Sequence, residues 1–238
     1  MSFSFKQFIV EQDRCAMKVG TDGVLLGSWV SLEKNPQTVL DIGAGTGLIA
    51  LMLAQRSDAP QIDAIEIDED AYEQCVENFE NSTWADRLFC FHASLDEFAE
   101  EPEDEKYDLI VSNPPYFVPN EREVDLPENR KKARFNDSLP FEDLVAYASQ
   151  LLTDAGEFAV IIPFPEEEKF IRTTQNYNLF PKYITRVRGT KNATIKRSLL
   201  QFSFTEKIVE EKELILEISR HQYTEEFKEM VKEFYLKL

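Results

Sequence analysis

Short apolar runs alternate with amphipathic segments through the middle of the chain. Runs rich in β-branched and aromatic residues predict strands, and apolar positions at helical spacing predict helices between them. The strands are expected at 38–42, 61–67, 88–93, 107–112 and 157–163, and the helices at 48–56, 68–81, 139–155 and 165–175. Strands that alternate with helices predict a parallel sheet with helices on both faces.

The pattern changes after residue 180. Segments 181–189 and 197–206 alternate apolar and polar residues with no helix between them, which predicts an antiparallel hairpin. Residues 213–219 predict a further strand, and residues 224–238 a last amphipathic helix. Ser138 is expected to cap the helix at 139–155.

These elements predict an α/β fold, a doubly wound and mostly parallel seven-stranded sheet with the antiparallel hairpin at its C-terminal edge. No internal repeat or low-complexity linker interrupts the sequence. We therefore expect residues 1–238 to form a single domain, preceded by an N-terminal segment over residues 1–35. We also expect a monomer.

Composition points to a globular protein of the cytoplasm. No apolar run approaches the roughly 20 residues that cross a bilayer, and charge comes too early for a signal peptide. Cys15, Cys75 and Cys90 are widely spaced, which suits a reducing compartment better than disulfides or zinc. With only two histidines, a histidine-rich metal centre is not expected, and we predict no metal and no membrane partner.

Charge is distributed unevenly along the chain. The net charge is −18, yet residues 169–205 hold eight bases and no acid. Conversely, residues 96–105 hold seven acids and no base, which predicts a solvated loop or helix face. A cluster of bases on one part of a fold is typical of nucleic-acid binding. The alternative is that these bases pair with the protein's own excess of acids.

The first predicted strand runs directly into a glycine-rich turn, DIGAGTG, and then a helix. Such a turn allows a ligand to approach the backbone and the free N–H groups at the helix start. Glu66 ends the second strand, where a carboxylate can accept hydrogen bonds from ribose hydroxyls. The glycines are spaced GxGxG rather than the GxGxxG of NAD-binding proteins, and this resembles S-adenosylmethionine (SAM) methyltransferases. The predicted cofactor-binding residues here are Asp41, Gly43, Ala44, Gly45, Gly47, Glu66 and Ile67.

The fourth strand ends in SNPPYF, which should face the same crevice because parallel strands end at one edge. The lone pair of an exocyclic amine is delocalised into its ring. The Asn113 side-chain oxygen and the Pro114 carbonyl can accept its two N–H groups and orient it toward a methyl donor. Tyr116 or Phe117 offers a face on which a planar ring can stack. We predict Asn113, Pro114 and Tyr116 as catalytic residues, with Asn113 also near the cofactor.

These motifs leave four hypotheses open. The chain could methylate adenine in RNA, or a glutamine amide in a protein with the same NPPY chemistry. It could also bind RNA without catalysis, although an intact Asn113 and glycine turn weigh against that. A small-molecule methyltransferase is the fourth hypothesis. It is disfavoured because Asn113 suits planar amines better than hydroxyls.

Nearly the whole chain resembles the bacterial tRNA(Val) adenine-N6 methyltransferases. The resemblance is carried by residues 5–30, which include KVGTDG, and by LDIGAGTG, IEID and SNPPYF. It implies a class I, Rossmann-like SAM methyltransferase that modifies the adenosine next to the anticodon of tRNA. It also implies that the N-terminal segment covers the site, with Thr21 and Asp22 closing over the amino acid end of SAM.

The resemblance extends to further site residues. Relatives often carry an acid after the third strand that contacts the adenine amino group of SAM. Here Ser94 and Leu95 stand at that place and are assigned to the cofactor. The predicted substrate-binding residues are Lys18, Phe117, Arg134, Arg188, Lys191, Lys196 and Arg197. The acidity of the whole chain is unexpected for an enzyme that acts on tRNA.

Overall fold

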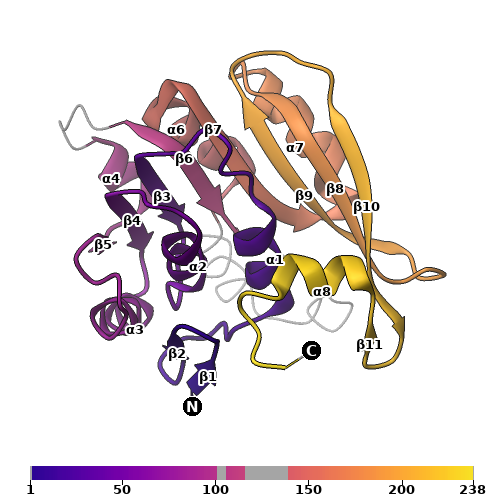
Figure 1. Ribbon diagram of the computed structural model, residues 1–238. Helices are drawn as coiled ribbons and strands as arrows, with labels where there is room; N and C mark the ends of the chain where they lie inside the picture. Colours follow the sequence, from indigo (N-terminus) through magenta and orange to yellow (C-terminus); the bar gives the residue numbers. More distant parts are fainter. Residues whose placement is uncertain (1, 101–105, 116–138, 238) are drawn as a thin grey trace, which may run out of the picture.

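A single large sheet runs through the molecule, preceded by a small hairpin (Figure 1). The computed structural model describes residues 2–100, 106–115 and 139–237. The hairpin is formed by β1 (Ser2–Ser4) and β2 (Ile9–Glu11). The strands of the sheet are β3 (Thr38–Ile42), β4 (Gln61–Glu66), β5 (Leu88–His92), β6 (Tyr107–Ser112), β7 (Leu152–Pro163), β8 (Phe180–Thr190), β9 (Ile195–Ser203), β10 (Glu210–Ser219) and β11 (Gln222–Tyr223).

The strand order is β11-β10-β8-β9-β7-β6-β3-β4-β5. From β7 through β6, β3 and β4 to β5, every pairing is parallel, whereas β9 pairs antiparallel with both β7 and β8. The predicted α/β class, with its mostly parallel sheet and C-terminal hairpin, is therefore confirmed. The sheet has nine strands over the described ranges instead of seven, because β10 and β11 extend it beyond the hairpin.

Helices cover both faces of this sheet (Figure 1). They are α1 (Thr21–Trp29), α2 (Leu48–Arg56), α3 (Glu69–Glu80), α4 (Leu95–Glu100), α6 (Phe141–Leu151), α7 (Glu167–Gln175) and α8 (Glu225–Val231). Neighbouring residues of β3 point to opposite faces. Val39 lies in a core cluster with side chains of α1, α2, α3 and α8, and Leu40 lies in a second cluster with α4, α6 and α7. Burial on both faces explains the continuous apolar runs of the central strands.

Two predicted helices are shorter in the structure. The helix expected at 139–155 is α6, which ends at Leu151, and β7 begins at Leu152. Gly156 lies within this strand, where an added Cβ would come within 2.8 Å of the Tyr107 carbonyl oxygen. The glycine therefore permits close strand packing and does not end a helix. The expected cap, Ser138, lies outside the described residues.

The helix expected at 224–238 is α8, which ends at Val231. The chain then turns so that Tyr235 forms a bridge with Phe5 of the N-terminal segment. Phe234, 2% exposed, is buried in the core cluster that contains Phe5 and Val39. Tertiary packing of these aromatic residues against the N-terminus outweighs the helical periodicity of the sequence.

The second core cluster contains three phenylalanines that are fully buried. Phe202 of β9 packs its ring 6.2 Å from Phe158 and 5.9 Å from Phe170. We expect Phe202→Ala to lower the free energy of unfolding by about 3–5 kcal/mol, because it leaves a cavity in a packed core. Phe204→Ala, at a partly buried position two residues along, should cost clearly less. Urea denaturation measures both, and equal losses would contradict this description of the core.

Candidate active site

The glycine turn between β3 and α2 adopts a backbone that requires glycine. Gly43, Gly45 and Gly47 have φ angles of 72°, 55° and 76°. A Cβ on Gly43 or Gly45 would project into open space, whereas on Gly47 it would lie 2.5 Å from a Phe79 ring carbon and 2.8 Å from Cys75 Sγ. The turn is therefore open on one side and closely packed against α3 on the other.

At the start of α2, the backbone N–H groups of Gly47 and Ala50 are bonded within the protein, whereas those of Leu48 and Ile49 are available to a ligand. The N–H of Gly47 donates to Ala44 O (2.9 Å), and that of Ala50 to Asp41 Oδ2 (3.2 Å). The N–H groups of Leu48 and Ile49 have no acceptor in the part of the chain that the structure describes. Free N–H groups at a helix start suit a carboxylate or another anion.

Asp41 lies beneath this turn and is fully buried. Its Oδ1 has no hydrogen-bond partner among the described residues. Burial raises the pKa of Asp41 from 3.8 to about 7, against the N–H of Ala50, which lowers it. The nearby Glu66 charge raises it further. A neighbouring cation would relieve this cost and favour the ionised carboxylate.

The end of β4 provides an acid and an exposed apolar side chain. Glu66 Oε2 accepts the N–H of Gly45 at 2.7 Å, and Oε1 accepts that of Asp68 at 3.0 Å. Ile67, which follows, is 65% exposed. Each carboxylate oxygen retains a lone pair for a hydroxyl donor, and the Ile67 side chain could pack on a planar ring.

Asn113 lies beside the glycine turn because β6 pairs with β3. Ser112 is the register partner of Ile42, and its Oγ donates to Ile42 O at 2.8 Å. The next residues along the two strands are Asn113 and Gly43. Asn113 Oδ1 is buried and has no hydrogen-bond partner within the described ranges. A buried unpaired acceptor is costly, so this oxygen is well placed to receive a donor from a ligand.

The remaining predicted residues are placed as follows. Ser94 follows β5, and both its Oγ and its backbone N–H donate to Glu97 Oε2, at 2.7 and 3.1 Å. The Leu95 side chain is 5% exposed and belongs to the core, so that only its backbone could meet a ligand. Thr21 is the first residue of α1 and is exposed, as is Lys18 before it. Tyr116, Phe117 and Arg134 lie outside the described residues.

Asp22 and Arg197 are predicted for cofactor and substrate respectively, and the structure joins them. Arg197 Nε donates to Asp22 Oδ2 at 2.8 Å. Arg197 of β9 is the register partner of Pro163 at the end of β7, and Gly23 beside Asp22 packs against Leu48 of α2. This ion pair therefore lies at the same edge of the sheet as the glycine turn.

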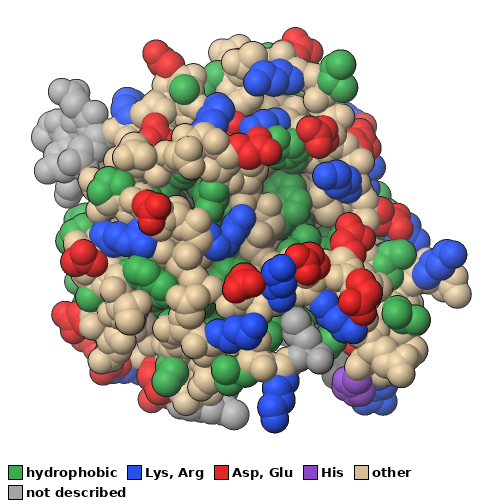
Figure 2. All heavy atoms as spheres, viewed as in Figure 1, with side chains coloured by type: hydrophobic (Ala, Val, Ile, Leu, Met, Phe, Trp, Pro, Cys, Tyr) green, Lys and Arg blue, Asp and Glu red, His purple; other side chains and the backbone are tan. Residues whose placement is uncertain are grey.

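Most bases of the acid-free window are paired with acids. Arg186 contacts Glu167 and Glu211, Arg188 contacts Glu213, and Lys182 contacts Glu157. The hydrogen bonds that Arg186 donates to Glu167 raise the pKa of the Arg186 guanidinium. With Arg172 and Arg197, five of the eight bases have an acidic partner. Lys169, Lys191 and Lys196 are exposed, and none of the three forms an ion pair with a described residue. Acidic and basic side chains also intermingle on the face drawn in Figure 2.

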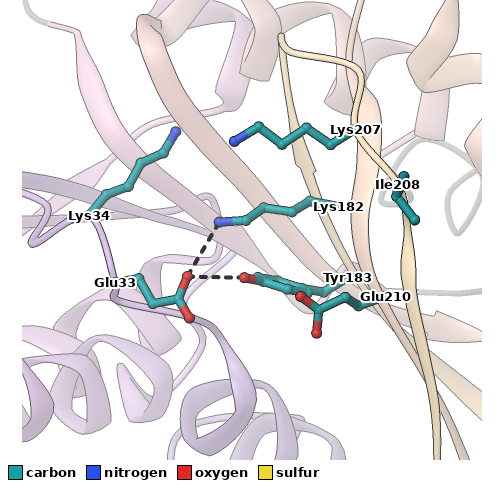
Figure 3. A pocket seen from close by; sticks show the side chains of 7 residues that line it. All are labelled: Glu33, Lys34, Lys182, Tyr183, Lys207, Ile208 and Glu210. Atoms are coloured by element: carbon teal, nitrogen blue, oxygen red, sulfur yellow. Dashed lines mark hydrogen bonds and ion pairs between the residues drawn. The ribbon is translucent and has the colours of Figure 1, made fainter.

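A separate cavity of about 390 Å³ lies at the opposite edge, where β8 and β10 begin (Figure 3). Lys34, Lys182 and Lys207 line it together with Glu33, Tyr183, Ile208 and Glu210. Glu33 accepts the Tyr183 hydroxyl at 3.0 Å and lies 3.8 Å from Lys182. Its cations are thus largely matched by acids, and it is remote from Asn113 and the glycine turn.

No helix in the described ranges is long and apolar enough to cross a membrane. Over the same ranges, no three His, Cys, Asp or Glu side chains gather in a way that could hold a metal ion.

Comparisons with known proteins agree with this geometry. Residues 23–173 match the family model "Methyltransferase small domain". The fold resembles a crystal structure from Agrobacterium tumefaciens described as "a predicted O-methyltransferase", with a TM-score of 0.70 at 18% identity, covering 90% of this chain and 96% of that one. The chain is thus a methyltransferase of the class I fold.

The curated relatives narrow the family. A protein of Christiangramia forsetii named tRNA1(Val) (adenine(37)-N6)-methyltransferase is 62% identical over 99% of this chain and 98% of its own length. A protein of the same name from Photorhabdus laumondii is 42% identical over 98% of this chain and 95% of its own. This chain belongs to the tRNA1(Val) (adenine(37)-N6)-methyltransferase family, and the resemblance seen in the sequence is confirmed.

The raised pKa of Asp41 predicts a specific pH dependence of stability. Because the folded chain holds this proton more tightly than the unfolded chain, the stabilisation is complete below pH 3.8 and is lost as the pH rises to about 7. Between pH 4 and 7, the unfolding free energy of wild type should fall relative to that of Asp41→Asn by up to roughly 4 kcal/mol. Urea denaturation at several pH values measures this difference. If the unfolding free energies of wild type and Asp41→Asn change in parallel with pH, the pKa of Asp41 is not raised in the folded chain.

Proposed function

We propose that this chain transfers a methyl group from SAM to the N6 amine of adenine 37 in tRNA1(Val). Relatives of that name cover nearly the whole chain. The structural observation that carries the proposal is the buried, unpartnered Asn113 Oδ1 beside the glycine turn. We further propose that residues 1–238 act as one domain and as a monomer in the cytoplasm.

The residues around the glycine turn fit SAM. The free N–H groups of Leu48 and Ile49 suit its carboxylate, and the carboxylates of Asp41 and Asp22 are the nearby acids for its ammonium group. Glu66 can accept hydrogen bonds from the ribose hydroxyls while it also accepts the Gly45 N–H, and Ile67 can pack against the adenine ring. SAM would supply a methyl group on a sulfonium, and attack by the N6 amine would release the thioether S-adenosylhomocysteine and one N6 proton, so the chemistry requires no metal ion.

Asn113 and Pro114 act on the amine that receives the methyl group. Asn113 Oδ1 accepts a hydrogen bond from one N6–H, and the Pro114 carbonyl oxygen can accept a hydrogen bond from the other. Two acceptors held by a rigid Pro-Pro backbone fix the direction of the amine and help localise its lone pair. We propose that Tyr116 or Phe117 stacks on the target base.

Asn113→Ala tests this role. Methyl transfer to tRNA should fall by at least roughly a hundredfold, because the amine loses its orienting acceptor. The affinity for SAM should change little. Single-turnover methylation and calorimetry measure the two quantities. A transfer rate within a few-fold of wild type would refute the proposed role, and a parallel loss of SAM binding would show that Asn113 serves the cofactor instead.

We propose that the exposed lysines at the edge of the sheet that carries the glycine turn and Asn113 contact the RNA. Lys191 and Lys196 flank the turn between β8 and β9, and Lys169 lies in the first turn of α7 after β7. Lys18 precedes α1 near the same edge. Arg186 and Arg188 are tied to acids of their own fold, so we assign them a structural role in holding β10 to β8. Arg197 forms an ion pair with Asp22, which is proposed for the cofactor.

The double variant Lys191→Glu and Lys196→Glu tests this surface. Each lost phosphate contact should make the log–log dependence of tRNA affinity on salt shallower by about 0.7–0.9. Binding should weaken while SAM affinity is retained. A control with the same charge change, Lys228→Glu and Lys232→Glu on and after α8, should bind tRNA more nearly like wild type. Equal salt slopes in the two double variants would place the RNA site elsewhere.

A further inference from the structure

One buried side chain on α3 joins the glycine turn to the N-terminal segment. Asn78 is 2% exposed. Its Nδ2 donates to Thr46 O in the turn and to Glu11 O in β2, both at 2.9 Å. Its Oδ1 accepts the N–H of Glu11 at 2.8 Å. Both donors and the acceptor of this amide are used, and they connect three segments that are remote in sequence.

The same face of α3 also packs against the turn. Cys75 and Phe79, three residues before and one after Asn78, are the side chains that exclude a Cβ at position 47. Cys75 and Phe79 supply only contact, whereas Asn78 supplies the hydrogen bond that fixes the Thr46 peptide. Leu48 and Ile49 come two and three residues after Thr46, with only Gly47 between, so the direction of their free N–H groups depends on how the Thr46–Gly47 peptide is held.

Further bonds continue the attachment along the N-terminal segment. The N–H of Arg14 donates to Gln74 Oε1 of α3 at 3.3 Å, and that of Val19 donates to Gln12 Oε1 at 2.7 Å. Gln12 and Gln74 are also buried. The segment between β2 and α1 is thereby held along α3, and it leads directly to Asp22.

We propose that Asn78 is a positioning residue for the amino acid end of the cofactor. Through Thr46 it orients the free N–H groups of the turn, and through Glu11 it fixes the segment that carries Asp22. The residues proposed for the ribose and the adenine, Glu66 and Ile67, lie at the end of β4 and just after it, and neither is among the hydrogen-bond partners of Asn78. The inference rests on the proposed SAM site and assigns Asn78 a task within it.

Two ligands separate this role from a general structural one. S-adenosylhomocysteine carries the nucleoside and the amino acid tail, whereas 5′-methylthioadenosine carries the nucleoside without the tail. Asn78→Asp keeps an acceptor for Glu11 N–H but loses both donors, and it turns a carboxylate toward two carbonyl oxygens. We expect this variant to bind S-adenosylhomocysteine at least roughly tenfold more weakly, and 5′-methylthioadenosine within about threefold of wild type.

Asn81→Ala is the matched control. Asn81 caps the same helix, and among the described residues its Nδ2 bonds only to Glu77 O within α3, at 2.8 Å. This variant should bind both ligands like wild type. If Asn78→Asp weakens both ligands equally, or neither, the inference is overturned. If wild type itself fails to bind S-adenosylhomocysteine, the proposed cofactor site fails instead.

Hydrogen exchange in the wild-type chain provides a measurement that does not depend on a folded variant. The Glu11 amide, which is bonded to Asn78, should exchange more slowly by a factor of roughly ten when S-adenosylhomocysteine is added. The effect of 5′-methylthioadenosine at equal saturation should be clearly smaller. Equal protection by both ligands, or none by either, would contradict a link between Asn78 and the amino acid end.

Discussion

The parallel pairing of β3 with β6 is the constraint on which the site depends. Each strand continues into a segment that cannot extend the sheet, a glycine turn after β3 and two prolines after β6. The pairing of Ile42 with Ser112, reinforced by the Ser112 hydroxyl, brings these two segments side by side. A cofactor bound by the turn and an amine bound by Asn113 would then be neighbours without further adjustment. On the proposed function, one pair of strands would thus set the relative position of methyl donor and acceptor.

The charge pattern is consistent with the RNA contact proposed for this acidic chain. Glu211 and Glu213 of β10 neutralise Arg186 and Arg188 of β8, and the buried Glu167 and Glu157 hold Arg186 and Lys182. Exposed ion pairs contribute little stability, whereas buried carboxylates need such partners. The lysines of the hairpin turn lie beyond the reach of these acids. A segment of +8 charge therefore offers far fewer cations to a polyanion than its sequence suggests.

Local patterns in the sequence predicted the local parts of the site. The strand, glycine turn and helix over residues 38–56 follow from periodicity and from the backbone needs of glycine, and they are confirmed. Parallel strands that end at one edge were enough to predict that Asn113 faces the turn. Features that depend on distant contacts were not predictable. Asn78 looked like any polar residue of an amphipathic helix, and only the fold brings Thr46 and Glu11 to it. The early end of α8 likewise depends on aromatic partners at the far end of the chain.

Transfer of labelled methyl groups tests the central claim most directly. The chain would be incubated with methyl-labelled SAM and total RNA from a strain that lacks its gene, and the RNA digested to nucleosides. The account predicts that the label appears in N6-methyladenosine, in a single tRNA species, and that nuclease treatment before the reaction abolishes its incorporation. Label that resists nuclease and stays with protein, as a glutamine-N5 methyltransferase would leave it, or label in another nucleoside, would contradict the account.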